Sequence, residues 1–259
     1  MLSMSDSVTF LGTSDGLPSP DRNHASLLLR LAGQTILVDC GEPCSHTLKR
    51  MRVEFNSIDA VFVSHTHSDH VGGLPMLLQS MWLEGRTRPL PLWTPHRAIR
   101  PLHDWLHACY LFEPLFKFRI NWRAISPQKV GRVGNVKFCA HRTTHLDETR
   151  ARFAKKFSRV GFDAFSFVFE AGRNRIGYSA DIGKPRDLTP LCTKPLGLLV
   201  VELAHFHPDD LIEFLRGRDV EYVAITHMGR AVRARLREVR ARFTKLRVRF
   251  VRDGDTIRL

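Results

Sequence analysis

The 259-residue chain has no apolar run long enough to span a bilayer. Its N-terminus has no long apolar core, so we expect no signal peptide. The five cysteines are scattered and form no Cys-x-x-Cys pair, which suggests a reducing compartment. Low-complexity segments and internal linkers are also missing. These absences together predict a soluble cytoplasmic protein.

Acidic residues are scarce relative to basic ones. The chain has 26 Asp and Glu against 39 Lys and Arg, for a formal net charge of +13. Such an excess favours a polyanionic partner such as nucleic acid, although a basic bias of the whole proteome explains it equally well. The apolar fraction of 43% is ordinary for a globular protein, so the chain can bury a substantial core.

The most informative stretch runs from Ser64 to His70 and has the sequence Ser-His-Thr-His-Ser-Asp-His. The residues before it, Ala60 to Val63, are small, β-branched or aromatic, which is typical of a buried strand. After Gly73, leucines and a methionine fall on one face of a helix. Three histidines and a carboxylate therefore follow a core strand, where α/β folds place chemistry because the strand end fixes the loop.

The spacing within this stretch indicates two metal ions. Residues two apart on an extended segment point the same way, so His65 and His67 can reach one ion. Asp69 and His70 lie past a bend and can face a second ion. Imidazole and carboxylate ligands suit zinc, and also manganese or iron. The alternative is a polar loop in which the histidines occur by chance.

The pattern His-x-His-x-Asp-His after a strand resembles the signature of the metallo-β-lactamase superfamily. The start of the chain resembles ribonuclease Z, the branch that processes tRNA 3′ ends. The segments that carry this second resemblance are Phe10-Leu11-Gly12-Thr13, Pro18 to Pro20, Arg22-Asn23 and Asp39-Cys40-Gly41-Glu42. The resemblance implies an α/β fold, a four-layer αββα sandwich. It would form a single domain over residues 1–259, with a helical and strand insertion near 84–130.

The resemblance also implies the remaining metal ligands. The next ligand follows a strand by several residues, which selects His145, with His141 as the alternative closer to the strand. Asp181 would bridge the two ions, and Ala180 stands before it where Gly is usual; a turn aspartate is the alternative. His227 directly follows a strand and would be the last ligand. The first ion then takes His65, His67 and His145, and the second takes Asp69, His70 and His227.

Such a ligand set implies a hydrolase in which two divalent ions, zinc above all, make hydroxide available near neutral pH. Asp69 would orient that hydroxide or take its proton. Glu202 lies in a buried strand and needs a partner. We expect Glu202 to orient His207 or His205, which would donate a proton to the leaving group.

The expected activity is phosphodiester hydrolysis similar to that of ribonuclease Z on a tRNA precursor, and the resemblance implies a homodimer. Most ribonuclease Z proteins grip tRNA with a long Gly/Pro-rich arm, and the interval from His145 to Asp181 is too short for one. The basic segment Glu148 to Val160 is a candidate substitute. Hydrolysis of a small cyclic phosphate or cyclic nucleotide is the alternative. An RNA-binding protein with structural metals is a third interpretation, which the complete ligand set argues against.

Three further features have more than one interpretation. Asp39 is either a support beneath the metal loop or a helix N-cap. His103 and His107 lie four apart on a helix that Pro101 can open, a spacing that can hold zinc, although they lie beside its apolar stripe. A helix over 230–243 carries arginines beside an apolar stripe, which suit either phosphate contacts or a solvated face.

Overall fold

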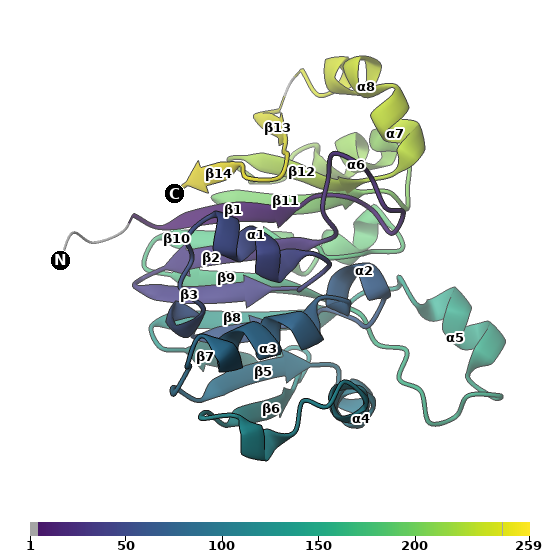
Figure 1. Cartoon of the computed structure of the whole chain (residues 1–259). Coiled ribbons are helices and arrows are strands. Elements are labelled where there is room, and N and C mark those ends of the chain that lie inside the picture. The colour runs from purple at the N-terminus through teal and green to yellow at the C-terminus, as the bar shows by residue number, and fades with distance from the viewer. Residues whose placement is uncertain (1–4, 245) are drawn as a thin grey trace.

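The structure, a computed structural model, describes residues 5–244 and 246–259. Two seven-stranded sheets lie face to face, with strand orders β14-β1-β2-β3-β4-β5-β6 and β13-β12-β11-β10-β9-β8-β7 (Figure 1). The strands of the first sheet are β1 (Ser7–Gly12), β2 (Ser26–Leu31), β3 (Gln34–Val38), β4 (Ala60–Phe62), β5 (Leu90–Thr94), β6 (Ile120–Ala124) and β14 (Thr256–Arg258). Those of the second are β7 (Val130–Val133), β8 (Val136–Arg142), β9 (Phe165–Ala171), β10 (Asn174–Tyr178), β11 (Leu198–Leu203), β12 (Val223–Met228) and β13 (Val248–Phe250).

Helices cover the outer faces of both sheets (Figure 1). The α-helices are α1 (Cys44–Arg50), α2 (Ser68–Val71), α3 (Leu74–Leu83), α4 (Ile99–Ala108), α5 (Asp147–Phe153), α6 (Pro208–Leu215), α7 (Arg230–Ala234) and α8 (Leu236–Arg242). Short 3₁₀ helices are η1 (Phe55–Ser57), η2 (His96–Ala98), η3 (Glu113–Leu115), η4 (Pro185–Leu188) and η5 (Leu191–Thr193). Within the described residues, no helix is long and apolar enough to cross a membrane.

Side-chain alternation along the strands separates three apolar layers. In β11, Leu198 and Val200 face the first sheet, whereas Leu199 and Val201 face the outer helices. A strand buried on both faces is a continuous apolar run, which explains why β11 is so hydrophobic. A second outer layer lies between the first sheet and helices α1, α3 and α4. The expected αββα sandwich is therefore confirmed.

The chain direction gathers the carboxyl ends of several strands at one edge of the sandwich. Strands β3 to β6 run parallel to one another, as do β10 to β13. Strand β8 has the same direction as β10, because both pair antiparallel with β9. The loops that follow β4, β8, β10, β11 and β12 therefore meet at this edge, where α/β folds commonly bind ligands.

Some sequence expectations for the elements need correction. The single helix expected over 230–243 is two helices, α7 and α8, because Arg235 leaves helical geometry at φ −115° and ψ 31°. Strands β6, β7 and β14 were not expected. In the stretch near 84–130, β5 and β6 form the edge of the first sheet, and α4 packs on its outer face.

Candidate metal centre

The histidine-rich stretch leaves the buried end of β4 and turns into helix α2. His65 is fully buried, and His67 is the N-cap residue of α2. The backbone N–H of His70 donates to the carbonyl of His67 over 3.0 Å. Asp69 and His70 are thus in a single helical turn rather than a loop, and this turn separates them from the two earlier histidines.

The other expected ligands come from the second sheet and meet this stretch. One group of side chains that could hold an ion contains His65, His67, His145 and Asp181, and a second contains Asp69, His70, Asp181 and His227. The structure thus brings together all seven residues expected as ligands. In each group, the ligand atoms lie within 4.8 Å of one another.

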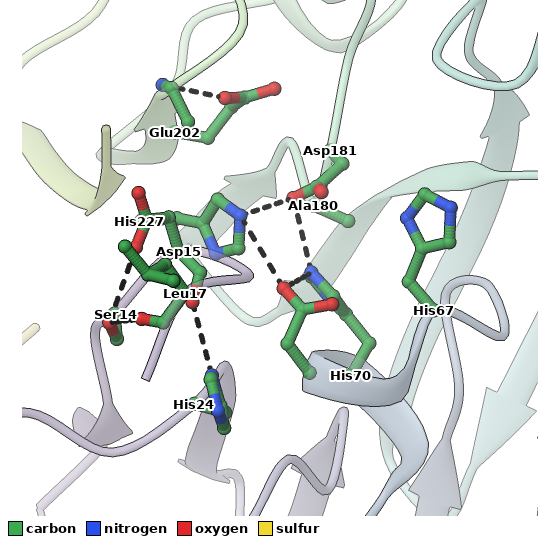
Figure 2. Close-up of polar contacts among 12 residues, drawn as sticks. Ser14, Asp15, Leu17, His24, His67, His70, Ala180, Asp181, Glu202 and His227 are labelled. Carbon is green, nitrogen blue, oxygen red and sulfur yellow. Dashed lines mark hydrogen bonds and ion pairs between the residues drawn. The ribbon is translucent and has the colours of Figure 1, made fainter. Parts of the chain in front are cut away.

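Asp181 faces both groups with different oxygens. Its Oδ2 lies 3.8 Å from Nε2 of His65 and 3.6 Å from Nε2 of His145. Its Oδ1 lies 3.2 Å from Nε2 of His70 and 3.4 Å from Nε2 of His227 (Figure 2). A carboxylate in this position can bridge two cations and offset their mutual repulsion.

The chemistry of the cluster fits divalent cations. Among the described residues, three buried atoms that face the cluster have no hydrogen-bond partner: His65 Nε2, His70 Nε2 and Asp181 Oδ1. Unpaired buried polar atoms are costly, so a group that binds them is expected. Burial lowers the pKa of His145 to about 4, so its imidazole is neutral near pH 7 and has a free lone pair for a metal.

Asp39 supports the metal loop from below. Its fully buried carboxylate accepts hydrogen bonds from the backbone N–H of Ser64 at 2.7 Å and from the Ser64 hydroxyl at 2.9 Å. It also contacts Nδ1 of His70 at 2.8 Å and accepts from the Tyr178 hydroxyl at 2.9 Å. The N-cap of α1 is Pro43, so the helix-cap alternative for Asp39 is wrong. With its Nδ1–H held by Asp39, His70 presents a bare Nε2 to the cluster.

Three residues of the site have left-handed backbones. The φ angle is +58° at Asp39, +46° at Ala180 and +44° at His227. Such conformations cost non-glycine residues of order 1 kcal/mol each and are found where the surrounding structure enforces them. The positive φ of Ala180 explains why a glycine is usual at this position in the family that the sequence resembles.

Sequence reasoning missed two buried supports. Asp187 accepts from the backbone N–H and hydroxyl of Thr144, each at 2.8 Å, and from the backbone N–H of Gly183 at 3.1 Å. It therefore ties the loop that carries His145 to the turn after Asp181. Tyr178, which binds Asp39, is the other. A Pro185 two residues before Asp187 marked only a turn, so the sequence contained no signal for this role.

Glu202 pairs with His205 and not with His207. Both Glu202 oxygens lie within 2.9 Å of Nδ1 of His205, and they also accept from the backbone N–H groups of Ile182 and Ala204. The His205 ring lies 4.6 Å from the ring of His145, with 35% of its side chain exposed. His207 is 61% exposed and caps α6 by accepting from the backbone of Asp209. The expectation for His207 is therefore corrected in favour of His205.

The N-terminal loop forms a wall beside the second ligand group. The carbonyl of Thr13 accepts from the backbone N–H of His227 over 3.1 Å, and Ser14 forms a parallel bridge with Met228. A Cβ on Gly16 would lie 3.6 Å from Oδ2 of Asp69, so this backbone passes close to the carboxylate. Figure 2 shows this loop next to His227. The segment that resembles ribonuclease Z thus lies at the site.

Comparison with known proteins supports both resemblances. A family model described as "Anti-Pycsar protein Apyc1" matches residues 7–196. A ribonuclease Z of Halorubrum lacusprofundi is 33% identical over 159 residues, which are 61% of this chain and 50% of that protein. The chain spans about a third to a half of the length of the curated relatives that it matches.

Solved structures agree on the fold. The metallo-β-lactamase fold protein YhfI of Bacillus subtilis superposes with a TM-score of 0.79 at 18% identity, covering 98% of this chain and 99% of the other. The short form of human tRNase Z superposes with a TM-score of 0.74 at 20% identity, covering 97% and 98%. The chain has a metallo-β-lactamase fold and a sequence similar to ribonuclease Z, as expected.

Proposed function

We propose that this chain, which belongs to the family described as anti-Pycsar protein Apyc1, is a metal-dependent hydrolase that cleaves phosphodiester bonds. The observation that carries the proposal is the position of Asp181, whose two oxygens face two separate groups of histidines and carboxylates. The ribonuclease Z relatives support the same class of reaction.

The residues that would hold the metals follow from the two groups. His65, His67, His145 and Asp181 would bind one divalent ion, and Asp69, His70, Asp181 and His227 would bind the other. Zinc suits this set best, and manganese or iron would also be accepted. When bound, two such ions lower the pKa of a water and stabilise negative charge on a phosphate.

The chain itself supplies a proton acceptor on the attacking side. Oδ2 of Asp69 lies 3.5 Å from Nε2 of His70 and 3.7 Å from Nε2 of His227, so the carboxylate faces the second ligand group. A carboxylate fixed here can orient the attacking water and accept its proton. The close passage of Gly16 shields this oxygen on one side.

The chain also supplies a proton donor. Burial alone would lower the pKa of His205. The hydrogen bond to Glu202 and the charge of that carboxylate outweigh burial and raise the pKa to about 9. The imidazole therefore carries a proton at neutral pH. Glu202 holds Nδ1–H, which leaves Nε2–H free for the leaving oxygen of the substrate.

Two substrate classes follow from different observations. The ribonuclease Z similarity and the net charge of +13 favour an RNA 3′ extension. The short connection over residues 143–164, which contains only the seven-residue helix α5, favours a small phosphodiester such as a cyclic nucleotide. Arginines and lysines from Arg150 to Arg159 lie on this connection and are available for phosphate contacts. From the ribonuclease Z resemblance and the free cysteines we further propose a cytoplasmic homodimer.

An assay with metal-reconstituted protein tests these proposals. A 3′-extended tRNA precursor, a cyclic nucleotide and bis-p-nitrophenyl phosphate are offered in parallel to the wild type and to Asp69→Ala. We expect hydrolysis of bis-p-nitrophenyl phosphate and of one natural class, and a loss of about 10²-fold or more in the variant. Cleavage of the tRNA precursor assigns the RNA substrate, and cleavage of the cyclic nucleotide alone assigns the small one. No hydrolysis of any phosphodiester contradicts the proposed function.

The proton donor is tested through the leaving group. In His205→Ala we expect kcat to fall by about 10²- to 10³-fold for the natural substrate, whose ribose oxygen needs a proton to leave. Hydrolysis of bis-p-nitrophenyl phosphate should fall much less, because p-nitrophenolate leaves without one. His207→Ala is the matched control and should match the wild type on both substrates. Equal losses on the two substrates in His205→Ala would argue against proton donation.

A further inference from the structure

A separate cluster of side chains that could bind a metal ion lies on α4 and η3. It shares no residue with the dinuclear centre described above. His103 and His107 are one helical turn apart on α4, with ring centroids 4.2 Å from each other. Glu113, at the start of η3, reaches both. Its Oε1 lies 2.6 Å from Nε2 of His103, and its Oε2 lies 3.0 Å from Nε2 of His107.

The three side chains converge from two elements. Their ligand atoms lie within 4.8 Å of one another. Zinc binds imidazole nitrogen and carboxylate oxygen at about 2.0–2.2 Å, so its ligand atoms lie about 3.3 Å apart and only small side-chain rotations are needed. The residues of an i, i+4 pair share one helix face, and both imidazoles here direct Nε2 to the same carboxylate.

The surroundings keep the three side chains in place and leave one side open. The buried residues Leu102 and Leu106 anchor α4 on the first sheet, and the His103 ring packs near Trp122. An open cavity of about 430 Å³ borders the cluster and is lined in part by His103, Glu113 and Trp122. A fourth ligand, such as water, can enter from there.

The charge of Glu113 suits a cation. Partial burial raises the pKa of Glu113, but the hydrogen bond from His107 and the two imidazoles lower it below its usual value. The carboxylate is therefore ionised at neutral pH. Exposed ion pairs of this kind contribute little to stability, because solvent competes for both partners. A divalent ion that replaces the shared protons gains two neutral imidazoles and one anion as ligands.

We propose that His103, His107 and Glu113 form a third metal site, selective for zinc-type ions and separate from the dinuclear centre. The ion would connect α4 to η3 across the exposed turn at Cys109 and Tyr110. Imidazole ligands favour zinc over magnesium or calcium, which prefer oxygen ligands.

Metal counting tests the site. The purified 259-residue chain is saturated with zinc, dialysed against zinc-free buffer and analysed for bound zinc by mass spectrometry. We expect about three zinc ions per chain in the wild type and about two in His107→Ala and in Glu113→Ala. His46→Ala removes an exposed histidine of α1 outside the cluster and is the matched control, with the count unchanged. Replacing zinc by magnesium should leave the third site empty.

A conservative variant and an activity assay separate loss of the third zinc from damage to the fold or to the dinuclear centre. Glu113→Gln preserves the size of the side chain, so it keeps the fold if Glu113→Ala does not, and it should weaken the third zinc by tenfold or more. Hydrolysis of bis-p-nitrophenyl phosphate should be unchanged in the His107 and Glu113 variants. A wild type that retains no more zinc than Glu113→Gln would overturn the third site, even if phosphodiester hydrolysis is observed. Three zinc ions in a protein without hydrolase activity would support the third site and contradict only the proposed function.

Discussion

Replacing Asp181 by alanine is expected to lower phosphodiester hydrolysis by about 10³-fold or more. Asp181 is the one residue shared by the two ligand groups, with one oxygen toward each. Without it, two dications would face each other with no anion between them, and their repulsion would expel one ion. The loss should therefore appear as missing metal and missing activity together.

The measurement is kcat/KM for bis-p-nitrophenyl phosphate alongside the metal content of each variant. Asp181→Asn keeps the shape of the side chain but removes its charge, so we expect an intermediate metal content. Asp219→Ala removes an exposed carboxylate that belongs to neither ligand group, so this variant should match the wild type in both measurements. If Asp181→Ala retained both ions and most of its activity, the assignment of Asp181 as the bridge would be wrong.

The part of this site that the sequence predicted is the part that depends on local spacing. His65, His67, Asp69 and His70 lie on one short stretch after a strand, so their convergence needs only the geometry of that strand and the turn after it. The more distant ligands His145, Asp181 and His227 were predicted from the family resemblance, and each follows a strand in the sequence. Parallel strands carry their carboxyl ends to a common edge whatever their order in the chain, so ligands at such ends converge.

The features of the site that the sequence did not predict depend on tertiary packing, which no local sequence pattern encodes. The choice of His205 over His207 is decided by the turn after β11, where Glu202 accepts backbone N–H groups and so bends the chain back. That turn swings His205 toward His145 and leaves His207 to cap α6. Tyr178 reaches Asp39 only because the two sheets stack, across 139 positions of sequence.

The break between α7 and α8 was also not visible in the local sequence pattern. The apolar stripe of residues 230–243 has helical period throughout, and no glycine or proline interrupts it. Helix α7 ends at Ala234, although Val232 and Leu236 on either side of the break pack with Val239 and Phe243 against the outer face of the second sheet. Tertiary packing overrides helical propensity, which is a weak preference.

Replacing Asp39 by asparagine is expected to weaken zinc binding by about 10- to 100-fold. The carboxylate accepts from four donors, and an amide has one oxygen and a nitrogen that cannot accept. At least one buried donor is therefore left unpaired, at a cost of about 1–3 kcal/mol in the free energy of unfolding. If the unpaired donor is Nδ1 of His70, the ring can change tautomer and place its proton on Nε2, where the metal should bind.

Asparagine is the informative substitution because Asp39 has a φ of +58°. Asparagine adopts this backbone readily, whereas alanine would add strain unrelated to the carboxylate. Tyr178→Phe removes one of the four donors and is the graded comparison, with a smaller loss of zinc affinity. The measurements are zinc affinity by chelator competition and the free energy of unfolding of metal-free protein in urea. A lower stability with unchanged zinc affinity would mean that Asp39 holds the loop but does not orient His70. A parallel fall in both, larger for Asp39→Asn than for Tyr178→Phe, is the result expected if one buried carboxylate sets both the fold of the loop and the direction of its ligand.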